Sequence, residues 1–298
     1  MNEIYIFNIA KLAVKSIISV ASVYPKPGLV TPIDCNALNA ADFPCFLDGA
    51  MSLFQSFVNC ASAGADTESI APEDAFTILR SPGKIGINDV LYATRGRLAM
   101  KGHILCLGLL CAAAGRLTAQ KRILTQSALS LTASSFVRGM IRRELWPLTE
   151  NAEGKILTSS ERAYVTYGLE GCRGEAEHGF IQTMKAIEVM RKLEATQGQL
   201  NLRERLAHTL ITIIAENQDT ILAANGGIGE LMRVQDEAKK VLSEGGMITP
   251  LGLHAVFEMD KHLRSRGSAP NGSAVVLSSA LFICELEKMK MTRSGYEE

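Results

Sequence analysis

The chain has 298 residues, of which 47% are apolar, and its lysines and arginines equal its aspartates and glutamates in number. This apolar fraction is enough to bury a sizeable core. A formal net charge of zero argues against a nucleic-acid-binding protein and against a membrane-surface protein, because both classes usually carry a basic excess. A local basic pocket for a phosphorylated small molecule is still compatible with this balance.

The seven cysteines are odd in number, and no Cys-x-x-Cys pair occurs among them. This usage predicts reduced thiols in a cytoplasmic protein, not a disulfide framework. The N-terminus lacks the pattern of a secretory signal peptide. The most apolar run, ILCLGLLCAAAG at 104–115, is shorter than a bilayer-spanning helix, so we expect a buried helix there and no membrane segment.

Apolar residues recur at helical spacing along almost the whole chain. In the first 24 residues, Ile6, Ala13 and Ile17 fall on one helix face, and the prolines at 25 and 27 end that helix. Further helices are predicted over about 43–63, 98–114, 124–144, 174–196 and 204–224, around 231–241, from Thr249-Pro250 onward and from Ser273 onward.

Loops are predicted at 82–88 and 267–273, and 151–160 is predicted to be a surface excursion. Glycines mark two helix ends, at Gly115 and at Asn225-Gly226-Gly227. Alternating β-branched runs, which would indicate strands, are missing. The sequence therefore predicts an all-α protein with one compact domain over residues 1–298.

The passage YPKPGLV at 24–30 follows the first predicted helix directly, with Lys26 between two prolines. It can be a helix-ending loop that leaves a lysine in solvent. Alternatively, because proline fixes the backbone φ angle, the loop would limit the conformations of Lys26 and present its ammonium group to a phosphate. Local sequence leaves both interpretations open.

Glu175 and Glu177 lie in RGEAEHGF at 173–180, at a predicted helix start, where the helix dipole favours carboxylates. The pair could instead bind Mg²⁺ or transfer protons. Residues two apart on a helix diverge by about 200°, so the two would chelate one ion only if the helix began a turn later.

Three more charged residues stand in apolar surroundings. Asp48 looks half-buried in FLDGA, Asp219 lies in NQDT, and Lys101 begins the most apolar helix. Each also has a purely structural interpretation. Asp48 would form a structural hydrogen bond to another helix, Asp219 would lie at an exposed helix end, and Lys101 would extend its side chain to solvent. ANGGIG at 224–229 looks like a phosphate-binding loop but follows a helix and not a strand, so a dinucleotide-binding fold is excluded by context.

Taken in order, several stretches resemble the triphosphoribosyl-dephospho-CoA synthase family. They are YPKPGLV (24–30), DFPCFLDGA (42–50), KGHILCLGLLCAAAGRL (101–117), YGLEGCRGEAEHGF (167–180), QDTILAANGG (218–227), TPLGL (249–253) and APNGSA (269–274). No single stretch is specific, whereas their order and spacing together cover most of the chain. The family is all-helical and makes the precursor of the prosthetic group of citrate lyase and malonate decarboxylase.

The resemblance implies a transferase that uses ATP and 3′-dephospho-CoA, with Mg²⁺ as cofactor and with neither nucleic acid nor membrane as partner; a homodimer is left open. Such a reaction needs cations around the triphosphate and a base near the attacking hydroxyl. The resemblance assigns phosphate or nucleotide binding to Lys26, Lys101, Arg173, Gly226, Gly227 and Ser273, proton transfer to Glu175, Glu177 and Asp48, and Mg²⁺ binding to Glu175, Glu177 and Asp219.

The chain also departs from the family pattern at polar positions. Apolar or unrelated residues stand at 36–40, 95–100, 221–224 and 275, where the family usually carries histidine, lysine, asparagine or aspartate. Two interpretations follow: a divergent synthase that works with the surviving charged residues, or a non-catalytic paralogue that binds a nucleotide or partners an active homologue. A third, weaker interpretation is a different ATP- or phosphate-using transferase on the same scaffold.

Overall fold

The computed structural model describes residues 3–33, 42–150 and 154–289. Within these ranges the chain is helical without a strand, which confirms the all-α prediction. The elements are α1 (Glu3–Ala21), α2 (Phe43–Ser52), α3 (Phe54–Asp66), α4 (Pro72–Ala93), α5 (Lys101–Ala119), α6 (Gln126–Phe136), the π-helix η1 (Ile141–Leu145), α7 (Trp146–Glu150), α8 (Ser159–Tyr167), α9 (Gly171–Glu177), α10 (Ile181–Thr196), α11 (Leu202–Glu216), α12 (Thr220–Ser243), α13 (Pro250–Arg266) and α14 (Asn271–Lys288).

Side-chain caps define many of the helix starts. Asp42, Thr125 and Thr249 each accept a hydrogen bond from a backbone N–H in the first turn of α2, α6 and α13. Thr158 and Asn201 form complete capping boxes with a glutamate three residues later. Since the first N–H groups of a helix have no acceptor within it, these contacts fix where each helix begins.

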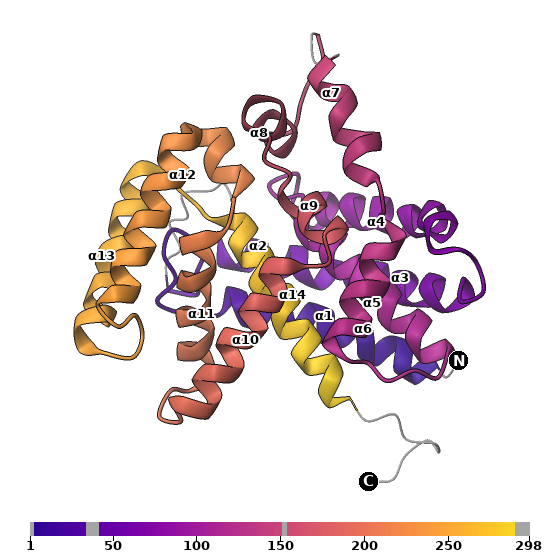
Figure 1. Cartoon of the computed structure of the whole chain (residues 1–298), viewed down its shortest axis with the longest axis horizontal. Helices are drawn as coiled ribbons and strands as arrows, with labels where there is room; N and C mark the ends of the chain where they lie inside the picture. The colour runs from indigo at the N-terminus through magenta and orange to yellow at the C-terminus, as the bar shows by residue number, and fades with distance from the viewer. Residues whose placement is uncertain (1–2, 34–41, 151–153, 290–298) are drawn as a thin grey trace.

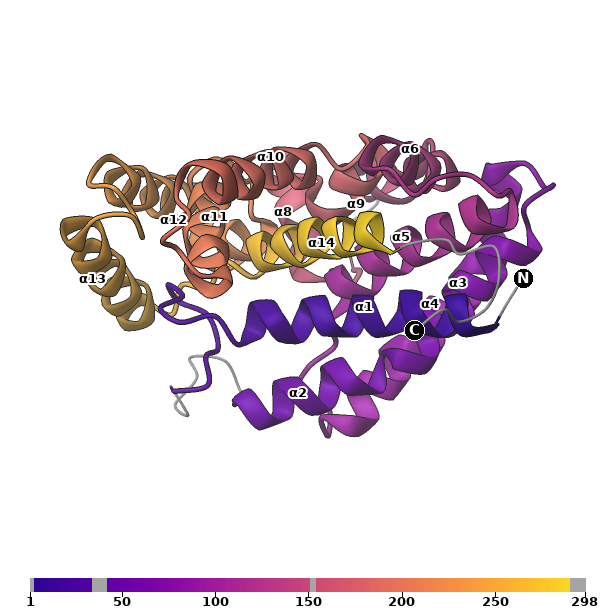
Figure 2. The same ribbon diagram turned by 90° about the horizontal axis from the view of Figure 1, so that it is seen from below.

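Helix α5 lies in the middle of the molecule, and buried apolar residues from α1 to α14 form one connected core around it. It packs against α3, α6 and α14, and α1 packs against both α3 and α14 (Figures 1 and 2). Helices α12 and α13 pack together at one side of the molecule, and α7 and α8 lie at another edge (Figure 1).

The contact between α3 and α5 is unusually close. A Cβ atom on Gly64 would lie 2.0 Å from the carbonyl oxygen of Ala112, and one on Gly115 would lie 2.0 Å from that of Ala61. Gly115 therefore permits helix packing inside α5, and the prediction that it ends the helix is wrong.

The predicted loop at 82–88 is also wrong, because these residues lie inside α4. Pro82 is buried, and its carbonyl accepts a hydrogen bond from the Ser56 hydroxyl at 2.9 Å. A Cβ on Gly86 would lie 2.5 Å from the Ser56 oxygen. Proline and glycine, which usually break helices, here allow α4 to approach α3 closely.

Other predicted helices are interrupted in the structure. The segment 43–63 divides at Leu53, and 174–196 divides at Phe180, whose φ is +61°. Segment 124–144 becomes α6 and η1. The segment 204–224 ends early, at Glu216, and α12 then continues through Gly227, where φ +77° and ψ 173° produce a kink and not a stop.

Several boundaries agree with prediction: the first helix, the Thr249-Pro250 start, and the helix through Leu231 and Val241. The last helix begins two residues before Ser273, and part of the excursion at 151–160 lies outside the described residues.

Two helices, Glu3–Ala21 and Lys101–Ala119, are long and apolar enough to span a membrane by length and composition. The second is longer than the apolar run at 104–115, so the length argument from sequence does not hold for it. Of its most apolar window, 83% is buried inside the protein, as is typical of a core helix.

Candidate functional site

Four helices from distant parts of the chain, α5, α9, α12 and α14, begin next to one another. A Cβ on Gly102 would lie 3.1 Å from the Cys172 sulfur and 3.1 Å from a Val275 methyl carbon, and one on Gly171 would lie 2.8 Å from a Thr220 methyl carbon. We call this meeting point of helix starts the N-terminal junction. Because helix N-termini carry partial positive charge and free N–H groups, such a junction favours an anion.

Asp219 joins two of these helix starts. Its Oδ1 accepts hydrogen bonds from the N–H groups of Ile221 and Leu222 at the start of α12. Its Oδ2 accepts from the N–H of Ser273 at 3.0 Å, in the first turn of α14. Asp219 is 2% exposed, and burial raises its pKa while these backbone bonds oppose the rise. The structure therefore brings together two predicted site residues, Asp219 and Ser273, as a double helix cap.

The start of α5 differs from those of α12 and α14, because the side chain of its N-cap residue forms no hydrogen bond with the first turn. Met100 holds the N-cap position with a left-handed backbone, at φ +45° and ψ +28°. Lys101 follows at the first helical position and is exposed. The N–H groups of this first turn, beside a lysine, are available to a ligand.

Arg173 and Lys101 share one electrostatic environment. The Arg173 guanidinium pairs with Glu144 at 3.2 Å and with Glu161 at 3.5 Å. Burial works to raise the pKa of Glu161, but hydrogen bonds from Thr158 and the charges of Arg173 and Lys101 lower it overall. The two predicted phosphate ligands therefore both act on Glu161, near the starts of α5 and α9.

Lys26 is not on a solvated loop, because its residue is only 3% exposed. Its Nζ donates hydrogen bonds to the carbonyl oxygens of Val20 and Ala21, each at 2.9 Å, at the end of α1. Burial, and then the charge of Arg264, lower the pKa of Lys26 to about 7. The amine thus completes a helix C-terminus, and protons can leave it near neutral pH.

The loop that carries Lys26 is held by α13. The N–H of Gly28 donates to Asp260 at 2.7 Å. Arg264 pairs with the same aspartate at 2.7 Å and donates to the carbonyl of Leu29 at 3.0 Å. Gly28 has φ +69°, and a Cβ there would lie 2.4 Å from the carbonyl oxygen of Ser268. Loop 24–30 is therefore fixed against the segment that leads into α14.

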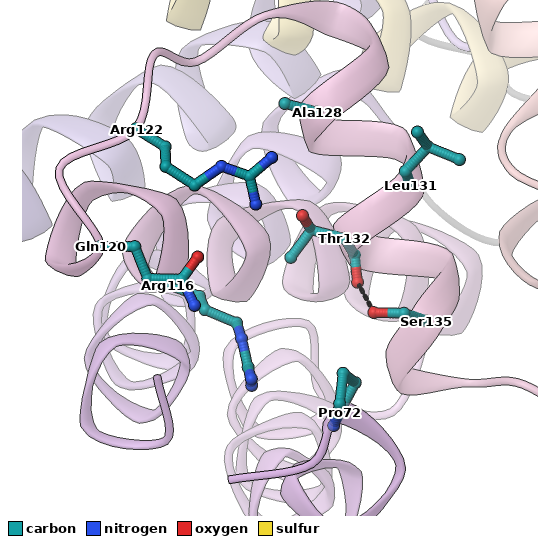
Figure 3. A pocket seen from close by; sticks show the side chains of 8 residues that line it. All are labelled: Pro72, Arg116, Gln120, Arg122, Ala128, Leu131, Thr132 and Ser135. Carbon is teal, nitrogen blue, oxygen red and sulfur yellow. Dashed lines mark hydrogen bonds between the residues drawn. The ribbon is translucent and has the colours of Figure 1, made fainter. Parts of the chain in front are cut away.

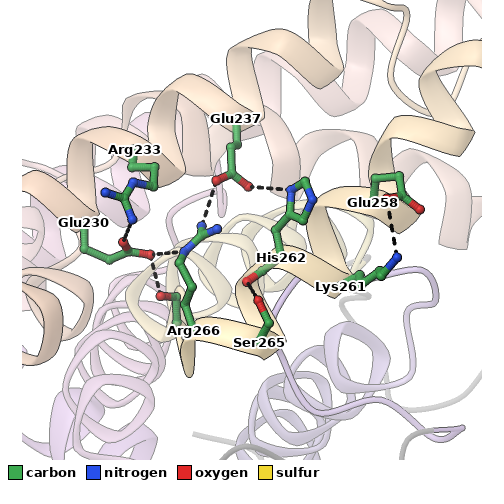
Figure 4. A network of polar contacts seen from close by, with 9 residues as sticks. Glu230, Arg233, Glu237, Glu258, Lys261, His262, Ser265 and Arg266 are labelled. Atoms are coloured by element: carbon green, nitrogen blue, oxygen red, sulfur yellow. Dashed lines mark hydrogen bonds and ion pairs between the residues drawn. The ribbon is translucent and has the colours of Figure 1, made fainter.

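Helix α13 is in turn attached to α12 by a network of polar contacts (Figure 4). Arg266 pairs with Glu230 at 2.9 Å and with Glu237 at 2.8 Å. Glu230 also accepts the Ser268 hydroxyl, and Glu237 faces His262 at 3.7 Å. This network connects the start of α14, loop 24–30 and α12 into one unit.

His103 is a residue that the sequence analysis missed. It is 8% exposed, in the first turn of α5, and its ring lies edge-on to Phe46 with centroids 6.3 Å apart. Burial, and then the charge of Lys26, lower the pKa of His103 to about 4, so the ring is neutral at pH 7. A polar residue inside the most apolar helix was the signal that could have identified it.

The two glutamates of RGEAE serve different backbone segments. Glu175 accepts hydrogen bonds from the N–H of Thr183 at 2.7 Å and from the N–H of Gln182 at 3.1 Å, at the start of α10. Glu177 accepts from the N–H groups of Gly139 and Ile141, each at 2.7 Å, at the start of η1. Each carboxylate therefore holds a helix start.

The proposed metal ligands are consequently not assembled into one set. Among residues 3–33, 42–150 and 154–289, no three histidine, cysteine, aspartate or glutamate side chains gather as a metal site. Glu175 and Glu177 each bind a different pair of backbone N–H groups, and Asp219 binds three others. These oxygens are already engaged, so they do not fit a resident Mg²⁺.

The remaining predicted residues lie on helix surfaces, with Asp48 and Gly226 exposed and Gly227 half-buried. Asp48 was expected to be half-buried, and this is wrong, because it lies on the exposed side of α2. Gly226 and Gly227 lie in α12, and a Cβ on Gly227 would lie 3.5 Å from the Tyr167 hydroxyl oxygen. The substituted positions 36–40 lie outside the described residues. Val275, another substituted position, is buried beside Gly102 at the junction.

Comparison with known proteins gives consistent matches over most of the chain. The pattern of a family described as ATP:dephospho-CoA triphosphoribosyl transferase matches residues 6–294. A 2-(5''-triphosphoribosyl)-3'-dephosphocoenzyme-A synthase from Klebsiella pneumoniae is 36% identical over 260 residues, which are 87% of this chain and 84% of that protein.

Among solved structures, a crystal structure of a protein from Archaeoglobus fulgidus, described as a candidate triphosphoribosyl-dephospho-CoA synthase, is similar with a TM-score of 0.52. The two are 15% identical, and the match covers 81% of this chain and 98% of that one. At this identity the likeness supports the fold alone.

Proposed function

The chain belongs to the ATP:dephospho-CoA triphosphoribosyl transferase family, and we propose that it transfers the triphosphoribosyl group of ATP to 3′-dephospho-CoA. The ribose 2′-oxygen of dephospho-CoA forms a bond to C1″ of the ATP ribose, and the bond from that carbon to adenine breaks. The triphosphate stays on the transferred sugar. The hydroxyl proton passes to a base, and adenine leaves after protonation or hydrogen bonding.

One observation carries the proposal: four of the stretches that resemble the family, although distant in sequence, contain the helix starts that meet at the N-terminal junction. The start of α5 supplies free N–H groups and Lys101. Helix α9 supplies Arg173, which is paired with Glu144 and Glu161 and would exchange these partners for phosphate oxygens. These groups suit a triphosphate, which needs fixed positive charge during transfer. Asp219 and Ser273 hold the starts of α12 and α14 at the same place.

Loop 24–30 contributes a buried amine to this proposal. Lys26 is bound to carbonyl oxygens only in the described structure, and a nearby triphosphate would raise its pKa by direct attraction. We propose that Mg²⁺ arrives with the triphosphate as part of the substrate, since the described residues offer no ligand set of their own. No step of the reaction is assigned to it.

For proton transfer, Asp48 stays a proposed group because its exposed carboxylate is accessible to a substrate. Glu175 and Glu177 act chiefly as positioning residues, because each binds a helix start through two backbone N–H groups. Gly226 and Gly227 stay proposed nucleotide contacts; they lie at the kink of α12, where Gly226 is exposed.

The test is adenine release from ATP in the presence of 3′-dephospho-CoA and Mg²⁺. We expect Lys101→Met to lower kcat/KM by about a hundredfold, because it removes a cation from the site of developing charge. Lys84→Met, on the exposed side of α4, is the matched control and should keep wild-type kcat/KM.

Wild-type protein that binds ATP in a calorimeter but releases no adenine would overturn the proposed reaction and leave a binding protein. Equal activity of the two lysine variants would instead show that the triphosphate does not bind at the junction.

The proposal also covers the compartment and the partner system of the enzyme. We propose a cytoplasmic enzyme that serves the acyl carrier subunit of citrate lyase or malonate decarboxylase. The described cysteines are free thiols, which suits a reducing compartment. A homodimer is also proposed, and size-exclusion chromatography with light scattering tests it.

A further inference from the structure

A hollow of about 290 Å³ lies at the opposite end of α5 from the N-terminal junction. It is formed by the C-terminal half of α5, the loop that follows, the outer face of α6 and the first residue of α4 (Figure 3). Fourteen residues separate Gly102 from Arg116, so the hollow is about 21 Å away along the helix. It is therefore separate from the proposed transferase site.

Arg116, on the wall of this hollow, is an anomaly. It is 7% exposed, and its guanidinium donates to the carbonyl oxygens of Thr67 at 2.9 Å and Ile70 at 2.6 Å. Neither partner carries a charge, and no described carboxylate forms an ion pair with it. By contrast Arg205 and Arg264, whose side chains are also mostly buried, each pair with a carboxylate.

A buried cation without an ion-pair partner is costly. Two carbonyl oxygens and the Phe136 ring, whose centroid lies 5.6 Å from the guanidinium carbon, contact Arg116, and none of them carries a full negative charge. Burial lowers the pKa of Arg116, and the charge of Glu68, which counteracts this, acts without direct contact. An anion in the hollow would supply the missing counter-charge.

A second guanidinium, that of Arg122, lines the same hollow. It forms no ion pair with a described carboxylate, and Figure 3 shows Arg122 and Thr132 pointing toward each other across the hollow. The amide of Gln120, which donates to the carbonyl of Glu68 at 3.1 Å, retains a second N–H. Charged and neutral donors therefore surround the space from α5, the loop and α6.

We propose that this hollow binds a small phosphate-bearing anion, with Arg122 as its direct ligand and Arg116 as the buried charge behind it. The planar guanidinium matches both phosphate and carboxylate oxygens. Donors on three sides favour the tetrahedral phosphate over a planar carboxylate. The volume is below that of pockets for drug-sized ligands, so the anion is small. The proposal does not depend on the transferase reaction.

The test is calorimetric titration of the full-length protein with inorganic phosphate at constant ionic strength. We expect Arg122→Glu to weaken binding at this site at least about tenfold, since it replaces a charge-assisted donor with a repelling carboxylate. Arg203→Glu, an exposed charge reversal on α11, should bind phosphate as the wild type does. Lys101→Met, at the other end of α5, should also retain this binding.

A second variant tests whether any loss of binding in Arg122→Glu comes from misfolding. Thr132→Glu places a carboxylate in the hollow from α6 and should lose phosphate binding in the same way, with an unchanged circular dichroism spectrum. Acetate at the same concentrations should bind more weakly than phosphate. The proposal fails if wild-type protein binds no phosphate, if Arg122→Glu binds it as Arg203→Glu does, if only Lys101→Met loses it, or if acetate binds equally well.

Discussion

Lys26 shows how far one side chain can differ from its appearance in the sequence. Proline on both sides suggests a stiff exposed loop, yet the amine is buried on the carbonyls that end α1. A lysine at a helix C-terminus is favoured by the dipole, while burial disfavours its charge. The amine is held between these effects, which leaves its pKa near 7.

This balance predicts a pH-dependent stability. Because the folded-state pKa is lowered from 10.5 to about 7, the unfolded chain binds more protons than the folded chain between these values. The contribution of Lys26 to the free energy of unfolding is therefore lowest below pH 7, and it rises as the pH increases from the folded-state pKa toward the unfolded-state pKa. The free energy of unfolding of the wild type, minus that of Lys26→Met, should therefore rise between pH 7 and 9.5.

Urea denaturation of both proteins across this range measures the difference. His103, with a pKa of about 4, does not titrate in the window. A difference that stays flat or falls from pH 7 to 9.5 would show that folding does not lower the pKa of Lys26.

The carboxylates illustrate what residue types alone leave undecided. The prediction that Glu175 and Glu177 lie at a helix start is wrong, because both lie in the last turn of α9, which ends at Glu177. They instead accept backbone N–H groups at the starts of two other elements, α10 and η1. The helix start that Glu175 caps follows the break at Phe180, whose left-handed backbone no propensity indicates. The sequence shows which side chains can accept hydrogen bonds, but it does not show which backbone N–H groups the fold brings next to them.

At the scale of elements, helical periodicity predicted most helices, and errors gathered at glycine and proline. Gly115 was predicted to end a helix and Gly86 to lie in a loop, whereas Gly64 and Gly115 bring α3 and α5 into backbone contact and Gly86 leaves room for the Ser56 side chain. A glycine that ends a helix and a glycine that permits close helix packing differ only in the atoms that the fold places against them. This depends on tertiary structure and cannot be predicted from local sequence. The Thr249-Pro250 start was predictable because cap and proline act locally.

Two glycines of α5 offer a matched comparison of these uses. Gly115→Ala should lower the free energy of unfolding by about 3 kcal/mol or more, because its Cβ would meet a backbone oxygen of α3 that cannot move aside. At Gly108 the nearest atom is the Cys60 sulfur at 3.4 Å, an ordinary contact. Gly108→Ala should change stability by no more than about 1 kcal/mol and in the stabilising direction.

Equilibrium denaturation in urea checks both variants. Similar losses at the two positions would mean that α3 and α5 are less closely packed than the structure shows.

At the scale of the whole molecule, the candidate site is assembled from segments that lie far apart in the sequence. Loop 24–30 and the starts of α5, α9, α12 and α14 meet through Asp219, Asp260 and close glycine contacts. Sequence resemblance named most of these segments but could not place them together, because it carries no distances.

Binding of ATP should therefore slow amide hydrogen exchange in all these segments at once. We expect protection at 24–30 and in the first turns of α5, α9, α12 and α14, measured by mass spectrometry with and without ATP and Mg²⁺. The first turn of α11, capped by Asn201 and remote from the junction, is the internal control and should not change. Protection confined to a single segment would contradict a shared site.

Helix α14 is the last described helix, yet it packs against α1, α5, α10 and α11 in the interior (Figure 2). During synthesis, the earlier helices leave the ribosome before the helix that fills the space between them exists. A nascent chain that stops before residue 271 would expose the apolar faces that α14 covers and would lack the Ser273 partner of Asp219. Premature termination should thus yield a substrate for chaperones and proteases, and no partly active fragment.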